Sequence, residues 1–149
     1  MSAHSTAANL LTHSLPHAIP EHANSRLFLL SVRRLGAYGL GDAHLANHFI
    51  TAFGPAFRRP LILMRVMMSE IAAAASTPMT IAPCCCMRMT ASEATLVDIM
   101  RRIDHQPMTA HALLADLLGN RRVDGVLATM ATVASAFADL GHPVDQIVA

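Results

Sequence analysis

Residues 61–75, LILMRVMMSEIAAAA, decide the fold of this chain. Wound into a helix, the stretch is apolar on nearly every side, and Arg65 and Ser69 form only a narrow polar strip. It is too short to cross a bilayer, and Arg65 and Glu70 interrupt it. The pattern therefore predicts a helix over roughly residues 60–75 that lies at the centre of a helical protein and is surrounded by other helices.

The side chains of this helix allow two further predictions. Met64, Met67 and Met68 resemble a soft-metal box, but methionines on a buried helix more often fill gaps in a core, and we favour core packing. Glu70 is the one carboxylate among these apolar residues. We expect it to form a buried ion pair, either with Arg65 or with an arginine elsewhere in the chain.

Capping residues and apolar periodicity predict helices on both sides of this stretch. These further helices begin at Asn24 or Ser25, at Asp42, at Thr90, at Thr109 and near Asp124. The clearest start is TASE, residues 90–93, which is a capping box. The fold class is all-α, an irregular bundle of five or six helices. Residues 24–149 form its single domain, and residues 1–23 are predicted to be a flexible tail.

Composition limits the partners of this protein. Hydrophobic residues make up 53% of the 149 residues and charged residues only 14%, so we expect a homodimer or a stable protein partner that covers apolar surface. The formal net charge of +1 gives no clear signal for nucleic acid. No run is apolar enough to span a membrane, and no secretory signal is visible at the N-terminus. A cytoplasmic location is expected.

The basic residues are all arginines, and eight of them stand in pairs. The pairs are Arg33-Arg34, Arg58-Arg59, Arg101-Arg102 and Arg121-Arg122. Arginine makes forked contacts with phosphates and carboxylates, so the pairs are candidates for an anion-binding surface. A chain without lysine is also typical of the coding bias of a GC-rich bacterial genome. We favour the compositional explanation, because no basic excess accompanies the pairs.

All three cysteines lie side by side in PCCCMRMT, residues 83–90. A disulfide among Cys84, Cys85 and Cys86 closes a small, strained ring, so a structural role for such a bond is disfavoured. Structural zinc sites space their cysteines as C-x₂₋₄-C pairs, which three adjacent thiols do not match. Two interpretations remain open: at least one thiol is reactive or binds a soft metal, or the three side chains pack a tight turn.

Arg88 follows the cysteines, just ahead of the helix that begins at Thr90. Positive charge and a nearby helix start both stabilise a thiolate, so Arg88 is the candidate thiolate-stabilising residue. Adjacent sulfurs also supply a resolving partner for an oxidised cysteine. The pattern indicates a loop that senses thiol oxidation or binds a thiophilic metal ion, which is the candidate cofactor.

His44 and His48 are one helical turn apart in DAHLANH, residues 42–48. This spacing can hold a metal ion, so both are candidates for additional ligands beside the cysteines. Both fall on the polar face of their predicted helix, and nothing in the sequence places that helix near the cysteine loop. Exposed histidines that bind nothing are the commoner case, and we expect little effect from replacing either one.

Two long runs resemble a known family. The runs LFLLSVRRLGAYGLGDAHLANHFITAFGPAFRRPLILMRVMMSEI and APCCCMRMT are similar to a small family of uncharacterised bacterial proteins, described as a domain of unknown function. The features most specific to the resemblance are the Arg-Arg-Pro run ahead of the Met-rich helix and the Pro-Cys-Cys-Cys run. The resemblance covers most of the chain after the tail, and it implies a bacterial origin and no established activity.

Three hypotheses about function follow from these patterns. The first is a small helical module that acts through the cysteine loop, by thiol redox sensing or soft-metal binding. The second is a non-catalytic interaction or adaptor module whose cysteines only pack. The third is an enzyme with a cysteine nucleophile and His44 as the base. Phosphate-binding, dinucleotide-binding and serine-hydrolase motifs are all missing from the sequence, so we lean towards a protein that is not an enzyme.

Overall fold

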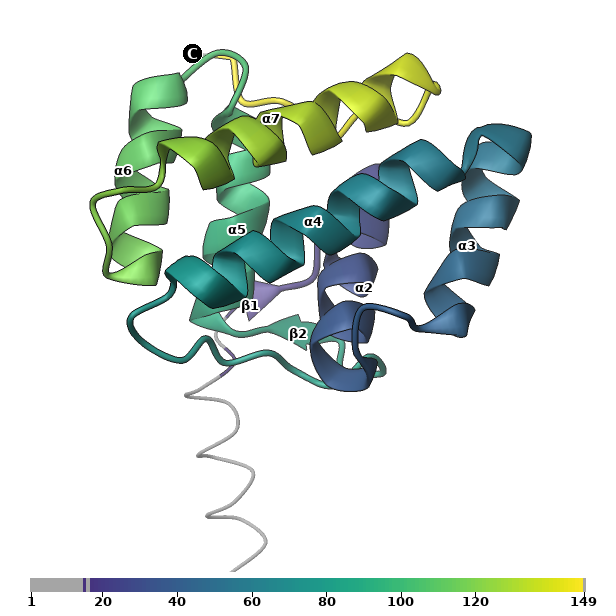
Figure 1. Ribbon diagram of the computed structural model, residues 1–149, viewed down its shortest axis with the longest axis horizontal. Coiled ribbons are helices and arrows are strands. Elements are labelled where there is room, and N and C mark those ends of the chain that lie inside the picture. The colour runs from purple at the N-terminus through teal and green to yellow at the C-terminus, as the bar shows by residue number, and fades with distance from the viewer. Residues whose placement is uncertain (1–14, 16, 149) are drawn as a thin grey trace, which may run out of the picture.

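The computed structural model describes residue 15 and residues 17–148, and these residues form a helical bundle with one very small sheet (Figure 1). The elements in chain order are β1 (His17–Ala18), α2 (Ala23–Tyr38), α3 (Ala43–Phe53), the short 3₁₀ helix η1 (Gly54–Ala56), α4 (Arg58–Ala74), β2 (Arg88–Met89), α5 (Ala91–Arg102), α6 (Pro107–Leu118) and α7 (Asp124–Asp139). The all-α class is therefore confirmed. Within the described residues, every helix is too short or too polar to cross a lipid bilayer.

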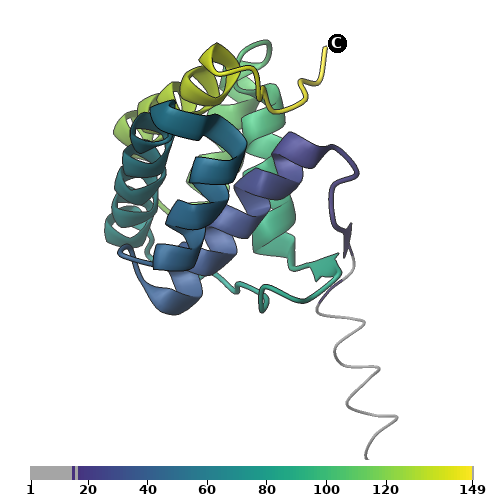
Figure 2. The same ribbon diagram turned by 90° about the vertical axis from the view of Figure 1, so that its right-hand side faces the viewer.

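The helices pack in two main pairs, and α2 and α3 complete the bundle. Helices α4 and α7 lie side by side along the front of the molecule, and α5 packs against α6 behind them (Figure 1). Helix α2 contacts α3, α4 and α5, so it connects the two pairs. Turned by 90°, the bundle shows α3 in the foreground, with the small sheet on the side away from α4 (Figure 2). The segment between α4 and β2 runs beneath the bundle.

Helix α4 supplies much of the core, but it is not surrounded on all sides. Met64 and Met67 are fully buried, as expected for methionines that fill gaps in a core. Ile62 and Val66 are 54% and 40% exposed, on the opposite face of the same helix. The prediction of a fully surrounded helix was therefore wrong. The helix also starts at Arg58, because the 3₁₀ turn η1 before it leads into the helix with helical backbone angles.

The ion pair predicted for Glu70 is absent from the described part of the chain. Neither Arg65 nor Glu70 forms a salt bridge there, and Arg65 Nε and Glu70 Oε2 are both buried atoms without a hydrogen-bond partner. The buried ion pair lies elsewhere, between Arg33 of α2 and Glu93 of α5. Periodicity alone could not show this, because the two residues are 60 positions apart.

The start of α2 differs from the prediction. The N-cap of α2 is His22, whose side chain makes no capping hydrogen bond. Asn24 instead donates from Nδ2 to the carbonyl oxygen of Pro143, and the Ser25 hydroxyl donates to the carboxylate of Asp145. Both residues tie the first turn of α2 to the segment that follows α7. At α3, by contrast, the predicted cap is confirmed, because Asp42 accepts a hydrogen bond from the backbone N–H of Leu45.

The end of the predicted N-terminal tail belongs to the fold. His17 pairs with Met89 and Ala18 with Arg88, in an antiparallel two-stranded sheet. Residues 1–14 and 16 lie outside the described residues, so a flexible tail over residues 1–23 stays a prediction. At the C-terminal end of this segment, backbone pairing with β2 ties the chain to the bundle.

Candidate functional site

The three cysteines occupy the tip of a tight turn. The backbone N–H of Cys86 donates to the carbonyl oxygen of Pro83 at 3.0 Å, which closes a β-turn with Cys84 and Cys85 at its two central positions. All three are free thiols; Cys85 is exposed, and Cys84 and Cys86 are half-buried. An exposed thiol therefore lies between two partly shielded ones, ahead of β2.

The backbone of this turn is held by Arg33, a buried residue of α2. Its Nη1 donates to the carbonyl oxygen of Cys86 and its Nη2 to that of Arg88, both at 2.7 Å. Its Nε donates to Glu93 Oε2 at 2.7 Å. The side chains of Arg33 and Glu93 are only 3% and 0% exposed. The planar guanidinium group fixes two carbonyl oxygens and one carboxylate at once, a geometry that lysine cannot reproduce.

Glu93 connects this ion pair to the start of α5. Its Oε1 accepts from the backbone N–H of Thr90 at 3.0 Å, and the hydroxyl oxygen of Thr90 accepts from the backbone N–H of Glu93 at 3.1 Å. The predicted capping box is therefore confirmed. The Thr90 hydroxyl also donates to the carbonyl oxygen of Thr80. The capped helix thus holds the segment before the turn, while Arg33 holds the segment after it.

Arg34, the neighbour of Arg33, reaches the turn from another side of α2. It forms a forked pair with Asp42, with both nitrogen–oxygen distances at 2.8 Å. These hydrogen bonds raise the pKa of the Arg34 guanidinium and lower the pKa of the Asp42 carboxyl to about 2. The nearby side chain of Cys84 also raises the pKa of Arg34, by less than Asp42 does.

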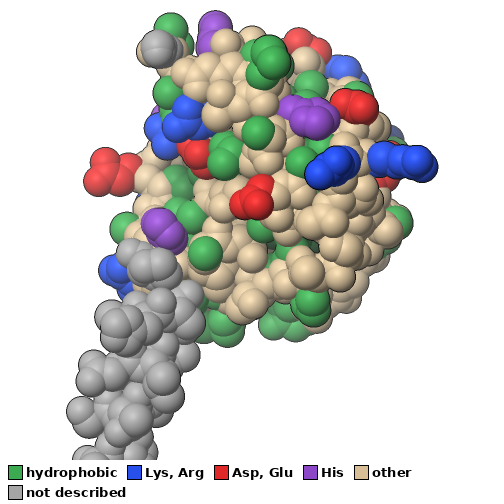
Figure 3. Space-filling model, turned by 90° about the vertical axis from the view of Figure 1, so that its left-hand side faces the viewer, with side chains coloured by type: hydrophobic (Ala, Val, Ile, Leu, Met, Phe, Trp, Pro, Cys, Tyr) green, Lys and Arg blue, Asp and Glu red, His purple; other side chains and the backbone are tan. Residues whose placement is uncertain are grey.

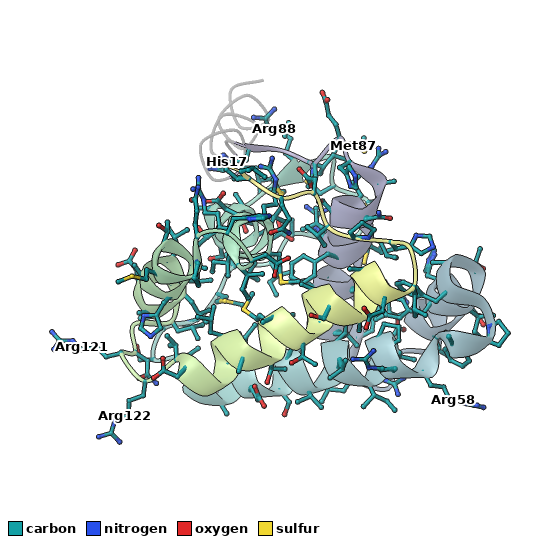
Figure 4. The ribbon with its side chains drawn as sticks, turned by 90° about the horizontal axis from the view of Figure 1, so that it is seen from above. His17, Arg58, Met87, Arg88, Arg121 and Arg122 are labelled. Carbon is teal, nitrogen blue, oxygen red and sulfur yellow. The ribbon has the colours of Figure 1, made fainter. Side chains whose placement is uncertain are left out.

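Arg88, the predicted thiolate-stabilising residue, lies in β2. Its Nε donates to the carbonyl oxygen of Leu15 at 2.7 Å, so it contacts the chain just ahead of β1. Viewed from above, Arg88 and Met87 extend from the edge of the molecule opposite α4 (Figure 4). A contact between Arg88 and a thiolate stays a prediction. The structure places another cation, Arg34, near Cys84. Its signal in the sequence is the Arg33-Arg34 pair, which composition alone also explains.

His44 and His48 are exposed residues of α3. Among the residues that the structure describes, no group of three or more His, Cys, Asp or Glu side chains is placed to hold a metal ion. The structure therefore does not add these two histidines to the cysteines as a ligand set. The small effect expected from replacing either histidine stays a prediction.

The paired arginines do not form one surface. Most of them bind carboxylates of the same chain: Arg33 binds Glu93, Arg34 binds Asp42, Arg59 binds Asp139, Arg101 binds Asp145 and Arg102 binds Asp98. Arg121 and Arg122 extend from one end of the molecule and Arg58 from the other (Figure 4). The pairs are therefore mainly parts of intramolecular ion pairs that are spread over the bundle.

Comparison with known proteins identifies the chain at the level of family only. Residues 2–139 match the model of a family described as "Family of unknown function (DUF6628)". Because the match spans nearly the whole chain, the protein belongs to this family of unknown function. No curated protein and no solved structure gives a match.

Proposed function

We propose that this protein is a regulatory module that senses oxidants through the thiols of Cys84, Cys85 and Cys86. The observation that carries the proposal is the exposure of Cys85 at a turn tip, between two half-buried thiols. An oxidant needs access to one sulfur, and a reversible response needs a second sulfur close by. Three consecutive residues of one turn supply both. In a reducing compartment, which we propose is the bacterial cytoplasm, such thiols rest in the reduced form.

The proposed chemistry uses a hydroperoxide as the oxidant. The Cys85 sulfur attacks the peroxide, the O–O bond breaks, and one oxygen becomes a sulfenic acid while the other leaves as water. A neighbouring thiol then attacks the sulfenic sulfur, an S–S bond forms, and a second water leaves with the thiol proton. Two thiols thus lose two electrons and two protons to one hydrogen peroxide, giving one disulfide and two waters. A bond within so short a segment is strained and easily reduced, which suits a switch rather than a structural link.

The surroundings of the turn support this proposal in two ways. Arg34 puts a permanent positive charge beside Cys84. Arg33 fixes the carbonyl oxygens of Cys86 and Arg88, so the backbone after the turn is held while the tip remains open. A packed structural turn would not require an exposed thiol at its tip. The alternative in which the cysteines only pack therefore explains less of this geometry.

Thiol labelling of the native protein tests the proposal. We expect a thiol reagent to label Cys85 first, and Cys85→Ser to remove this fast phase while Cys84→Ser and Cys86→Ser retain it. Treatment with hydrogen peroxide should lower the intact mass by two hydrogens, and dithiothreitol should restore it. If labelling requires prior unfolding, the proposal is wrong. If peroxide causes no loss of hydrogens but monovalent copper or cadmium binds to all three thiols, the loop is a soft-metal site instead.

A second candidate function is a non-catalytic interaction module. The observation that favours it is the number of large apolar side chains that remain exposed: Tyr38, Leu40, Ile50, Ile62, Val66, Met87, Met108 and Val148. One face of the molecule shows charged side chains scattered among apolar and neutral surface (Figure 3). A variant with all three cysteines changed to serine distinguishes the two functions. Retained partner binding with no peroxide response favours the adaptor, whereas loss of both favours the sensor.

A further inference from the structure

The outward face of α4 carries a heptad pattern. After its first turn, the exposed residues of α4 are Ile62, Val66, Ser69, Ala72 and Ala73. Four of them, Ile62, Val66, Ser69 and Ala73, are spaced by four, three and four positions. This is the alternation of the a and d positions of a coiled coil. The face is uncharged from Ile62 to Ala73, and Arg59, which pairs with Asp139, marks its charged end. Ile62 and Val66 are among the exposed large apolar side chains of the helices. Helix α4 lies along the lower edge of the molecule when viewed from above, where a second helix has access to it (Figure 4).

Two half-buried charged residues flank this stripe. Arg65 borders it on one side and Glu70 on the other, at the g and e positions of the same heptad register. Neither residue forms a salt bridge with any described residue, and each has a buried polar atom without a partner, Nε in Arg65 and Oε2 in Glu70. Buried polar atoms of charged groups are rarely left unsatisfied, because desolvation without a partner is costly. The monomer therefore leaves a complementary pair of charges unused.

The register of these charges selects an orientation. In a parallel pair of helices, a residue at g meets the residue at e five positions later on the partner helix. Arg65 then faces Glu70 of the partner subunit, and two-fold symmetry forms the contact twice. In an antiparallel pair, g faces g and e faces e, so arginine would meet arginine and glutamate would meet glutamate. The charges therefore favour the parallel arrangement.

We propose that two copies of this chain associate through α4, in parallel, with Ile62, Val66, Ser69 and Ala73 along the seam. The pairing of Arg65 with Glu70 of the partner subunit closes both edges of the contact. The small residues Ser69 and Ala73 let the two helix backbones approach closely at one end, while Ile62 and Val66 fill the other. This inference does not depend on the thiol chemistry.

The neighbouring helix α7 leaves room for the partner. It lies beside α4 in both Figure 1 and Figure 4, and Ala128, Thr132 and Ser135 are exposed on it. The hydroxyl of Thr132 donates to the carbonyl oxygen of Ala128, one turn earlier in its own helix. Its hydroxyl donor is therefore used within the helix. The side chains at these three positions are small and uncharged, so they neither block a second α4 nor repel it.

Charge reversal tests this interface. Sedimentation equilibrium should show a wild-type dimer at micromolar concentration. Arg65→Glu or Glu70→Arg alone should raise the dimer dissociation constant at least about tenfold, because each change turns two attractive pairs into repulsive ones. The double variant Arg65→Glu/Glu70→Arg should restore association. Arg121→Glu, which makes the same change of net charge as Arg65→Glu but at a distant exposed site, is the matched control for that variant and should remain dimeric.

Cross-linking tests the orientation without disturbing the charges. In a variant with Cys84, Cys85 and Cys86 changed to serine, Ser69→Cys places one thiol at a d position of the seam. In a parallel dimer the two d positions of one layer face each other, so oxidation should give a covalent dimer in high yield. Ser135→Cys in the same background is the comparison and should cross-link poorly. A wild-type protein that stays monomeric at 100 micromolar, a concentration of order 10⁻⁴ M, would overturn the proposal. So would a dimer whose dissociation constant is unchanged by the charge variants and in which Ser69→Cys forms no cross-link.

Discussion

Replacing Arg33 with methionine should destabilise the protein far more than replacing an exposed arginine, and it should also loosen the cysteine turn. Methionine retains much of the apolar length of the side chain, so the change removes mainly the charge and the donors. Glu93 would then remain fully buried without its partner. The carbonyl oxygens of Cys86 and Arg88 would lose the donors that hold them.

The magnitude follows from the burial of the pair. Removing one member of a buried ion pair costs about 3–5 kcal/mol, because an uncompensated charge is left behind. The two lost hydrogen bonds to the turn add less, since water reaches those carbonyl oxygens once the turn loosens. For a domain of this size, the melting temperature falls by about 2–4 °C per kcal/mol. The expected decrease for Arg33→Met is therefore about 6–20 °C.

Thermal unfolding followed by circular dichroism measures this decrease, and Arg59→Met is the matched control. Arg59 pairs with Asp139 at 3.1 Å, but the two side chains are 58% and 61% exposed, so its loss should cost less than about 1 kcal/mol. The double variant Arg33→Met/Glu93→Gln should lose less stability than the sum of the two single variants, because the second change removes the stranded charge. Thiol labelling below the melting temperature should be faster at Cys84 and Cys86 in Arg33→Met than in the wild type.

Two outcomes would refute this reasoning. One is an Arg33→Met variant that melts within the range of Arg59→Met, which would mean that Glu93 accepts burial without a cation. The other is strict additivity of the single variants at Arg33 and Glu93, which would show that the two side chains do not interact. Unchanged labelling rates at the half-buried cysteines would separately show that Arg33 does not control the turn.

Three further predictions concern other parts of the fold. Asn caps helices as well as Asp, so Asp42→Asn removes only the charge. The pKa of Asp42 in the folded protein is lowered to about 2, so the stability that its charge contributes is present above about pH 4 and is lost towards pH 2. The melting temperatures of the variant and the wild type should therefore converge as the pH falls through that window. Alanine at His44 or His48 should change the melting temperature by less than about 2 °C, with or without added zinc. Gly119→Ala should lower the free energy of unfolding by about 1–2 kcal/mol, because Gly119 has a positive φ and a serine side chain against it. Gly125 has open space around it, so Gly125→Ala should be neutral or slightly stabilising. Urea titrations measure both variants.

Local signals in the sequence predicted the helices well. The capping box at Thr90 and the cap at Asp42 each depend on residues within one turn of the same helix, and both are confirmed. The predicted cap of α2 was wrong, because its residues bind partners that are far away in the sequence. Asn24 and Ser25 have the composition of capping residues, but their side chains bind the segment after α7, more than 115 residues away in sequence. The capping propensity of a residue depends on its sequence neighbours, so it cannot predict such a distant partner.

The candidate site likewise has a part that local sequence predicts and a part that it does not. The cysteines and their helix were visible as a motif, and the exposure of Cys85 follows from the turn that the motif forms. The residues that shape the turn, Arg33 and Arg34, come from α2 and are separated from it by about fifty residues. The sequence marked them only as an arginine pair. Their role depends on the tertiary contact between α2 and the start of α5, which no local pattern encodes.

The Arg33–Glu93 pair explains how a stable bundle can carry an open thiol turn. A buried ion pair of this kind often contributes little net stability compared with an apolar pair of the same size. Here one guanidinium group also satisfies two loop carbonyl oxygens, and the carboxylate also caps α5. The fixed points are the carbonyl oxygens of residues 86 and 88, so Cys84 and Cys85 lie beyond them, at the tip. We therefore expect a change of covalent state at the tip to alter the turn at residues 83–85, while the backbone held at residues 86 and 88 remains in place.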